Sequence, residues 1–232
     1  MFRILKIVFQ IMYNFFKRLL DIIVSFITLI TLLPIFIPIT IILRLTGEGE
    51  VLYFQERCGM NNSKFYIWKF ATMLKNSINM GTGSITLIND PRVTKIGLFL
   101  RKTKINELPQ IINILKGDIS LVGPRPLVTK TFLAYNEYIQ SKIYNVKPGL
   151  TGIGSIIFRD EESIISAVTD EDPHEFYKRI IAPYKGKLEI WYQNHKSFLL
   201  DLQLIFLTAW VIIFPSSRLY EKWFKDLPKR SF

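Results

Sequence analysis

The sequence predicts a mixed α/β (α+β) protein, in which a compact cytosolic domain follows an N-terminal membrane helix that is broken at proline. Three observations predict this class. Residues 22–43 carry no charge, and at about 1.5 Å per residue they are long enough to cross a hydrocarbon core of about 30 Å. Residues 51–55 and 64–70 alternate in the manner of strands, and residues 56–59 are expected to form the turn after the first of them. Residues 103–117 repeat apolar side chains at helical spacing.

The composition of the 232 residues agrees with partial contact with lipid. Hydrophobic residues make up 49% of the chain, and 30 Lys and Arg against 19 Asp and Glu give a net charge of +11. This charge suits anionic lipid or phosphorylated substrates. We expect no nucleic-acid partner, because no nucleic-acid-binding fingerprint occurs. The single cysteine, Cys58, excludes an intrachain disulfide and a four-cysteine zinc site.

Residues 1–46 are expected to form an interfacial segment followed by a membrane helix. A plain transmembrane span is one interpretation of the apolar run. Against it, Pro34 and Pro38 interrupt the helical hydrogen bonds near the middle. Basic residues also flank both ends of the run, namely Lys17, Arg18 and Arg44, so charge does not choose an orientation. A re-entrant helix, bent at Pro34 and leaving by the face it entered, explains both facts.

The centre of the chain is residues 102–127. We expect Thr103 to cap a helix that holds Asn106 and Glu107 in its first turn and ends at Gly117. A short strand over residues 119–122 then leads into Gly-Pro-Arg-Pro, where two prolines fix the backbone around Arg125. A carboxylate at a positive helix end leaves nearby amides free for an anion, so a phosphate and a divalent metal are natural occupants. Alternatively, Glu107 complements the helix dipole and Arg125 makes an ordinary salt bridge.

The other elements follow from the same patterns. Helices are expected over residues 94–101, 131–144, 187–194 and 198–214. The last is short for a span, and we expect it to be an interfacial, amphipathic helix that lies against the membrane or against the catalytic core. Residues 146–152 read as a turn whose glycines permit close backbone approach to a ligand. Residues 215–232 form a basic and aromatic tail that favours anionic lipid.

The central block resembles the signature of a known family. Asn106-Glu107-Leu108-Pro109-Gln110, Lys116-Gly117-Asp118 and Gly123-Pro124-Arg125-Pro126 are similar to the Asp-Glu-Leu-Pro-Gln, Lys-Gly-Asp and Gly-Pro-Arg-Pro of bacterial sugar transferases, the small monotopic phosphoglycosyl transferases. The resemblance extends from about Lys17 to about Phe214. It implies a catalytic domain over residues 47–214, a re-entrant helix, and a monotopic protein at the cytoplasmic face of the bacterial inner membrane.

The resemblance also implies an activity. Members move a sugar-1-phosphate from a nucleotide diphosphate sugar, usually a UDP-sugar, to polyprenyl (undecaprenyl) phosphate, and release UMP in the first membrane step of surface glycan synthesis. The implied partners are the nucleotide-sugar donor, the polyprenyl phosphate acceptor and membrane lipid, and the implied cofactor is Mg²⁺. The implied catalytic residues are Lys69, Asn106, Glu107 and Arg125, with Glu107 and Asp118 as metal ligands.

Five further residues are candidates for substrate binding, namely Asp90, Arg92, Arg101, Gln110 and Arg159. Asp90 and Arg92 belong to an Asp-Pro-Arg-Val-Thr segment that is similar to one in the family, and Arg101 lies just before the central block, where it can attract a diphosphate. Two alternatives stay open. Asp90 can instead cap the helix that follows, and Arg159 can instead pair with the acidic residues 160–162.

Asn106 departs from the family pattern at the nucleophile itself. A neutral amide lacks the anionic oxygen with which a carboxylate attacks phosphorus. Three interpretations follow: Glu107 is the nucleophile, the lipid phosphate attacks directly, or the protein is a catalytically impaired membrane scaffold of a glycan-assembly complex. We expect an active enzyme, because Lys69, Asp118 and Arg125 are all present.

Overall fold

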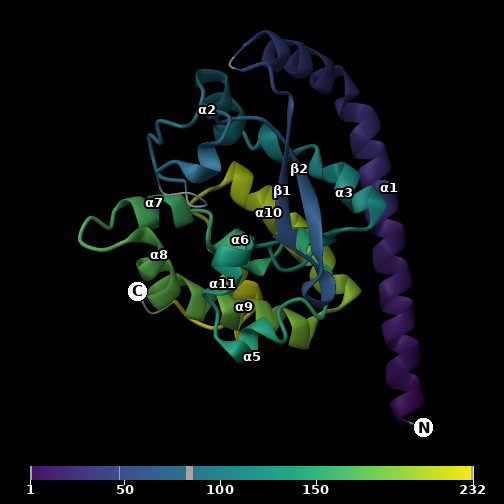
Figure 1. The fold of residues 1–232 in the computed structure, drawn as a ribbon. Helices are drawn as coiled ribbons and strands as arrows, with labels where there is room; N and C mark the ends of the chain where they lie inside the picture. Colours follow the sequence, from purple (N-terminus) through teal and green to yellow (C-terminus); the bar gives the residue numbers. More distant parts are fainter. Residues whose placement is uncertain (1, 47, 82–85, 231) are drawn as a thin grey trace.

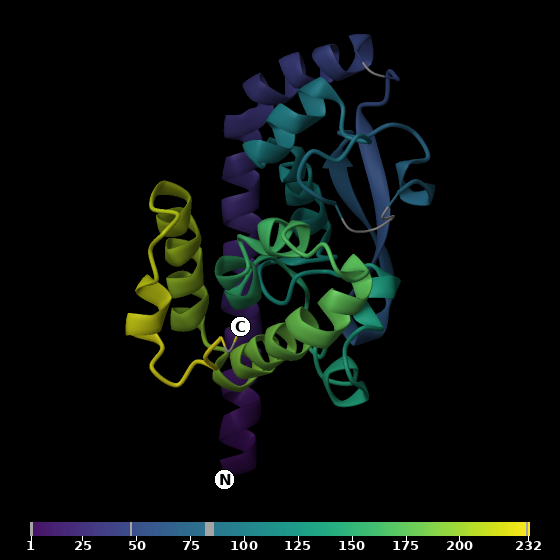
Figure 2. The same cartoon turned by 90° about the vertical axis from the view of Figure 1, so that its left-hand side faces the viewer.

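The computed structural model describes residues 2–46, 48–81, 86–230 and 232. A helix of 44 residues, α1 (Phe2–Leu45), lies along one side of a compact domain built from helices and short strands (Figure 1). The interfacial and membrane segments predicted separately are therefore one continuous helix. Pro34 and Pro38 lie inside it, and its last turns bend over the top of the domain in both views (Figure 2). The predicted domain boundary at residue 47 falls outside the described residues.

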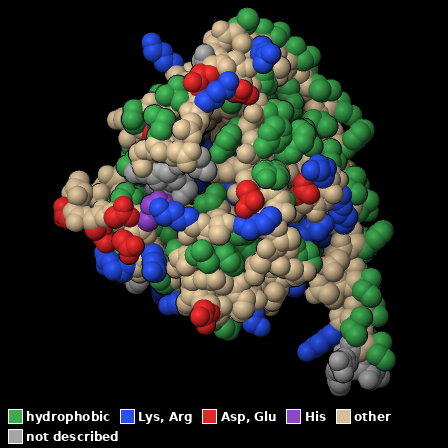
Figure 3. Space-filling view, viewed as in Figure 1, with side chains coloured by type: hydrophobic (Ala, Val, Ile, Leu, Met, Phe, Trp, Pro, Cys, Tyr) green, Lys and Arg blue, Asp and Glu red, His purple; other side chains and the backbone are tan. Residues whose placement is uncertain are grey.

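Helix α1 is long and apolar enough, by length and composition, to cross a membrane. Hydrophobic side chains cover its outer face along its length (Figure 3). Among its described side chains only Asp21, Ser25 and Leu43 are buried. Around Asp21 and Ser25, the side of α1 that packs on the domain is therefore polar, whereas the side that faces away is apolar.

Two small sheets carry the strands. Strands β1 (Leu52–Cys58) and β2 (Lys64–Phe70) pair antiparallel, with Tyr53 opposite Lys69. The turn between them is at η1 (Met60–Asn62), not at residues 56–59 as the sequence indicated, so Arg57 belongs to the strand. Strands β3 (Ser120–Val122) and β4 (Gly149–Thr151) pair parallel, and β4 occupies part of the segment predicted as a turn.

The central helix predicted over residues 103–117 is interrupted. A single turn, η3 (Ile105–Glu107), comes first, and helix α3 (Gln110–Lys116) follows it. Thr103 does not cap this helix: it ends α2 (Lys95–Lys102), and its hydroxyl donates to Phe99 O at 2.8 Å. Lys104 follows with φ of 61°, a left-handed conformation that separates α2 from η3. Gly117 ends α3 with φ of 88°, as predicted.

The remaining elements are mostly short helices. They are η2 (Ser77–Asn79), α4 (Thr129–Phe132), α5 (Glu137–Gln140), α6 (Ile153–Ile157), α7 (Glu161–Ser166), α8 (Pro173–Phe176), the π-helical η4 (Tyr177–Ile181), α9 (Ala182–His195), α10 (Phe198–Ile213) and α11 (Leu219–Trp223). Helices α9 and α10 confirm two predictions. The single helix expected over residues 131–144 is divided, because the Asn136 side chain accepts from Ile139 N and begins α5 afresh.

Two hydrophobic cores hold these elements together. The main core lies among α6, α9 and α10, where Ile153, Leu188 and Leu204 are fully buried. The smaller core is where the end of α1 packs, through Leu43, against Phe70 of β2 and against α2.

The C-terminal tail packs on the domain. Phe224 and Leu227 are buried in the main core, and Trp191 Nε1 donates to Asp226 at 2.9 Å. Part of the tail that was expected at lipid is therefore bound to α9.

Candidate active site

The candidate site forms where η3, β2 and the turn after β3 meet. Glu107 Oε1 accepts a hydrogen bond from Arg125 Nη2 at 2.8 Å and lies 3.4 Å from Lys69 Nζ. The Glu107 and Lys69 side chains are largely buried, with 16% and 15% exposed. Three residues predicted to be catalytic, from three separate elements, are thus in direct contact.

Arg125 is held by the backbone on both sides of it. The Tyr144 hydroxyl donates to Arg125 O at 2.9 Å and accepts from Leu127 N at the same distance. On the other side, Gly149 N donates to Pro124 O at 2.8 Å. With Pro124 restricting φ as well, the loop has little freedom to carry the guanidinium away from Glu107.

Glycines allow this loop to cross the β4 segment at backbone distance. A Cβ atom on Gly149 would lie 2.1 Å from Gly123 N, and one on Gly152 would lie 2.2 Å from Gly123 O. The close approach that the sequence assigned to a ligand is therefore an approach between two backbone segments. These glycines build the site, and Gly149 also lines the small pocket beside Glu107.

The electrostatics of the site are set by burial and by its cations. Burial alone would raise the pKa of Glu107, but Arg125, Lys69 and Lys104 outweigh burial and hold that pKa below its usual range. Glu107 is therefore ionised. Burial lowers the pKa of Lys69 to about 7, with Glu107 acting in the opposite direction. Glu107 accordingly lies within an excess of positive groups.

Arg57 is a site residue that the sequence analysis missed. Its Nη1 donates to Pro126 O at 3.1 Å, and its Nη2 donates to the Gln55 side chain. Burial and the neighbouring Arg125 lower the pKa of Arg57 to about 10, so its guanidinium is still charged at neutral pH. It adds a third cation beside Glu107.

Strand alternation could have identified Arg57. Tyr53 is opposite Lys69 in the antiparallel pair, and side chains two residues apart share a face. Arg57, four residues after Tyr53, therefore lies on the face of β1 that corresponds to Lys69. Assigning Arg57 to a turn hid that relation.

A small pocket opens beside the catalytic contacts. Its lining residues are Arg57, Ile67, Lys69, Gln110, Arg125, Pro126 and Gly149. Gln110, predicted to bind substrate, is buried at this pocket. Three cations and one amide around a small volume suit phosphate oxygens.

Asn106 is buried immediately before Glu107. Within the part of the chain that the structure describes, its Oδ1 has no hydrogen-bond partner. A buried acceptor without a partner is costly, and it is most readily satisfied by a donor or a cation that enters with the substrate.

The two predicted metal ligands are not together. Asp118 Oδ2 accepts from Asn113 Nδ2 at 2.9 Å and pairs with Lys116 at 3.2 Å. It follows α3, while Glu107 precedes that seven-residue helix, whose length is about 10 Å. Among the described residues no group of three or more His, Cys, Asp or Glu could hold a metal. Glu107 alone still fits Mg²⁺, which usually takes one or two carboxylates and completes its shell with water and substrate phosphates.

Asp90 and Arg92, predicted to bind substrate, form a buried pair. Arg92 Nη2 and Asp90 Oδ2 are 2.5 Å apart, and Arg92 Nη1 also donates to Ser77 O at 2.9 Å and Met80 O at 2.8 Å. Asp90 does not cap α2, because Thr94 does so by accepting from Gly97 N at 3.0 Å. The pair holds the loop before α2.

Arg101 and Arg159 remain predicted substrate-binding residues that no contact in the described part of the structure connects with Glu107. Across the described ranges, neither side chain makes a hydrogen bond or an ion pair, and Arg159 is exposed. Of the three alternative partners considered for Arg159, Asp160 pairs with Arg230 and Glu161 pairs with Lys185, and among the described residues Glu162 makes no ion pair with Arg159.

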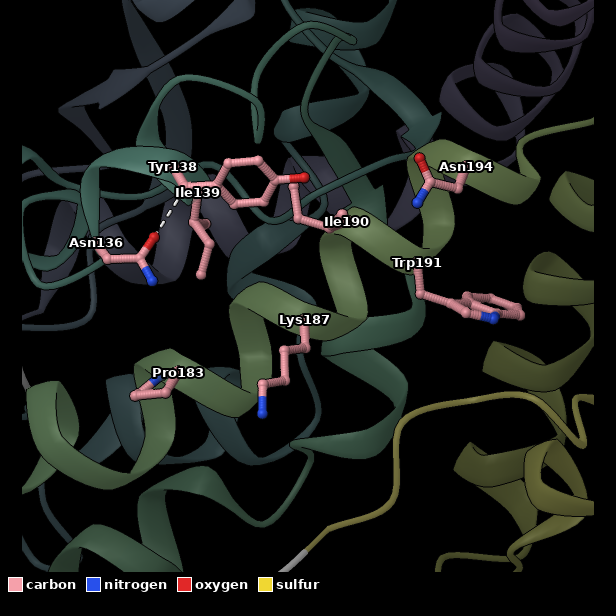
Figure 4. Close-up of a pocket in the computed structure, with 8 residues that line it drawn as sticks. All are labelled: Asn136, Tyr138, Ile139, Pro183, Lys187, Ile190, Trp191 and Asn194. Carbon is pink, nitrogen blue, oxygen red and sulfur yellow. Dashed lines mark hydrogen bonds between the residues drawn. The ribbon is translucent and has the colours of Figure 1, made fainter.

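A larger cavity, of about 430 Å³, lies between α5 and α9 (Figure 4). Its lining is Asn136, Tyr138, Ile139, Pro183, Lys187, Ile190, Trp191 and Asn194, and it shares no residue with the pocket beside Glu107. Lys187 is the only charged residue in that lining. The cavity therefore offers little to a diphosphate.

Comparison with known proteins identifies the family. The family model described as bacterial sugar transferase matches residues 12–215. The chain is 38% identical to a UDP-glucose:undecaprenyl-phosphate glucose-1-phosphate transferase of Klebsiella pneumoniae. The 197 matched residues cover 84% of this chain and 39% of that protein. The chain is also 30% identical over 214 residues to an undecaprenyl-phosphate galactose phosphotransferase of Salmonella typhimurium, covering 86% of this chain and 41% of that protein.

These relatives are much longer than the present chain. A shorter relative, the uncharacterized sugar transferase EpsL of Bacillus subtilis, is 35% identical over 193 residues, which cover 83% of this chain and 85% of that protein. The range matched by the family model, residues 12–215, includes Lys69, Glu107 and Arg125. The chain belongs to the bacterial sugar transferase family.

Proposed function

We propose that this protein transfers a sugar-1-phosphate from a UDP-sugar to polyprenyl phosphate, of which undecaprenyl phosphate is the acceptor in the relatives' names. UMP is the second product. The reaction is the first membrane step in the synthesis of a bacterial surface glycan. The chain spans only about two-fifths of the relatives that carry these names, so the activity rests on the site as well.

The observation that carries the proposal is the contact of Glu107 with Lys69 and Arg125, with Arg57 beside them. The donor is an anionic diphosphate and the acceptor is an anionic phosphate, so they repel one another. Fixed cations at the reacting phosphorus offset this repulsion and stabilise the charge that develops in the transition state. A pocket in which cations outnumber carboxylates supports that use.

In the proposed reaction, an oxygen of the acceptor phosphate attacks the sugar-bearing phosphorus of the donor. A new P–O bond forms, the bond from that phosphorus to the bridging oxygen breaks, and UMP leaves with the bonding electrons. Lys69 and Arg125 bind the phosphoryl oxygens and hold the two substrates in line.

We assign direct attack rather than a covalent enzyme intermediate. Asn106 offers no anionic oxygen. Glu107 is ionised, but its Oε1 is already bound by Arg125 and Lys69, which reduces its nucleophilicity. When Mg²⁺ is bound through Glu107 and the substrate phosphates, it supplies positive charge that makes the phosphorus more electrophilic. Asp118 is not a metal ligand in this proposal, because it follows α3 and bonds Asn113 there.

The proposed location is the cytoplasmic face of the bacterial inner membrane, with a monotopic topology. Both the early part of α1, at Asp21, and the late part, at Phe36 and Leu43, pack on the same domain. About 22 Å of helix separates Asp21 from Phe36, which is less than the hydrocarbon thickness of about 30 Å. A helix held at both places by one domain on one side of the membrane supports the re-entrant interpretation.

The decisive experiment is UMP release by detergent-purified protein with Mg²⁺, across a panel of UDP-sugars, with and without undecaprenyl phosphate. We expect release that requires the lipid and that selects one sugar. The Glu107→Gln variant is the control for contaminating phosphatases. Folded protein that releases no UMP with any sugar would favour the scaffold alternative.

A further inference from the structure

Helix α1 contacts the domain through charged groups. Lys17, Arg18 and Asp21 lie within little more than one turn, and Asp21 is 3% exposed on a helix whose outer face is apolar. Apolar side chains would hold two elements together with a smaller desolvation cost. Charged contacts at this place therefore suggest a need for exact geometry, which hydrogen bonds impose and apolar packing does not.

Arg18 fixes the far end of the helix that follows Glu107. Its Nη1 donates to Ile114 O at 2.6 Å and its Nη2 to Leu115 O at 2.7 Å. These carbonyls belong to the last turn of α3, where carbonyls lack the amide donors of a following turn. Ile114 O also accepts from the capping amide, Gly117 N, at 3.0 Å. Because α3 begins at Gln110, this contact sets the axial position and rotation of the element that carries η3 on its N-terminal side.

Asp21 and Lys17 fix the strand that precedes Arg125. Asp21 Oδ1 accepts from Ser120 Oγ at 3.0 Å and from Leu121 N at 2.9 Å. Lys17 Nζ donates to Val122 O at 2.9 Å, and it also pairs with Asp201 at 2.6 Å. Val122 is the last residue of β3, after which the chain enters the Gly-Pro-Arg-Pro turn.

We propose that Lys17, Arg18 and Asp21 are positioning residues of the active site, which align the segment after Glu107 with the segment before Arg125. The membrane helix is the common support for both halves of the Glu107–Arg125 contact. How α1 sits in the bilayer is thereby linked to the geometry of the phosphoryl-transfer site. The test of this inference by enzymatic activity rests on the proposed function, whereas the test by hydrogen exchange does not.

The first test is hydrogen exchange of the full chain in lipid nanodiscs. In Asp21→Leu, we expect amides of residues 119–127 to exchange at least about tenfold faster, because β3 loses the acceptor for Ser120 and Leu121. In Arg18→Met, we expect the same of residues 105–116, because the last turn of α3 loses its donor. Asp21→Asn keeps the acceptor oxygen and is expected to exchange as the wild type does. Gln10→Leu is the matched control, since Gln10 bonds only Asn14 on the exposed face of the same helix. Amides of α9 report that the rest of the fold is unchanged.

The second test is a double-mutant cycle in UMP release. Asp21→Leu is expected to lower turnover by about tenfold or more in the wild-type background and by much less in an Arg125→Lys background, because it acts through the Arg125 loop. Flotation with phospholipid vesicles should be equal for all variants. Equal losses in both backgrounds would mean that Asp21 acts independently of Arg125, which contradicts the proposal.

Unchanged exchange at residues 119–127 in Asp21→Leu, or at residues 105–116 in Arg18→Met, overturns the inference, whether or not the wild type has activity. A wild type that releases no UMP but shows the exchange pattern removes only the proposed function. If Asp21→Leu does not fold, the pair Lys17→Met with Asp201→Asn leaves no unpaired charge and keeps an acceptor for Tyr192. Faster exchange at residues 122–125 in that variant supports the inference, and wild-type exchange there overturns it.

Discussion

At the scale of residues, one oxygen of Glu107 connects the chemistry of the site, because Arg125 and Lys69 both contact Oε1. Removing the carboxylate leaves two cations facing each other, whereas removing Arg125 leaves the carboxylate with a more distant lysine. We therefore expect Glu107→Gln and Arg125→Ala each to lower UMP release by about 10²-fold or more. Lys64→Met is the matched control, since Lys64 starts β2, the strand that carries Lys69, but pairs with Glu56 at the surface. Normal release by both site variants would remove the site assignment.

Asn106 is the residue at which a gain can be tested. Asn106→Asp introduces an anionic oxygen beside Glu107, on a side chain that is already buried there. We expect this variant to form a phosphosugar adduct that can be trapped from labelled UDP-sugar without lipid, whereas the wild type forms none. Mass spectrometry of the intact protein measures the adduct. An adduct on the wild-type chain would instead assign the covalent step to Glu107.

At the scale of elements, the crossing of β4 over the proline-rich turn depends on the absence of a side chain. Gly149→Ala would place a Cβ against the backbone of Gly123 and force the turn that carries Arg125 to move. We expect a loss of about 1–3 kcal/mol in the free energy of unfolding, with a larger proportional loss of activity. Thermal unfolding in detergent measures the first effect. Thr151→Ser, in the same strand, adds no atom and serves as the control.

Helix α9 places an acid behind the same turn, and it gives a pH prediction. Burial raises the pKa of Glu189 from 4.5 to about 8, although Lys185 and the backbone N–H of Arg125 act against the rise. Between about pH 4.5 and 8 the folded protein holds a proton here that the unfolded chain releases. The Glu189 contribution to stability therefore falls as pH rises through this window.

Glu189→Gln mimics the protonated form at every pH. We expect its unfolding free energy to fall less than that of the wild type between pH 5 and 8, as measured by thermal melts at several pH values. The exposed Glu175→Gln should behave as the wild type does. A wild-type slope in Glu189→Gln would mean that this carboxyl is ionised in the folded state.

Elements with a strong local pattern were predictable from the sequence, and tertiary contacts explain the others. Strand 64–70 follows from alternation, and the end of α3 at Gly117 follows from its left-handed φ. The helix expected from Thr103 was wrong, because α2 extends to Lys102 and Lys104 adopts a left-handed φ before η3. No local sequence pattern indicates that α2 extends to Lys102 or that Lys104 adopts a left-handed φ.

For the site, the motif identified Glu107 and Arg125, but their partners required the fold. Arg57 was missed because its strand was assumed to end before it. Asp118 was expected to bind the metal together with Glu107, whereas the intervening helix carries it to Asn113 and Lys116. Sequence distance of eleven residues does not predict a shared site when a helix lies between.

At the scale of the whole molecule, the predicted division into residues 1–46 and 47–214 does not separate two segments that are stable independently. Lys17 pairs with Asp201, whose side chain is 1% exposed. A chain that begins at residue 48 would lose this ion pair and would expose the surface of the domain on which α1 packs. We expect that truncated chain to aggregate or to lack a cooperative melt. A soluble, cooperatively folding product would show that the catalytic domain is independent of α1.

The pairing of Lys17 with Asp201 has a consequence during synthesis. The two residues are 184 positions apart, so at 5–20 residues per second roughly 10 to 40 s pass between their emergence from the ribosome. In the first half of that interval, before residues 114–122 emerge, Lys17, Arg18 and Asp21 have none of their final partners, while the apolar face of α1 is already complete. The nascent helix should therefore rest in the headgroup layer with Lys17, Arg18 and Asp21 turned to water. The bilayer would then act as a holding surface, and the catalytic domain would fold onto a helix that is already oriented.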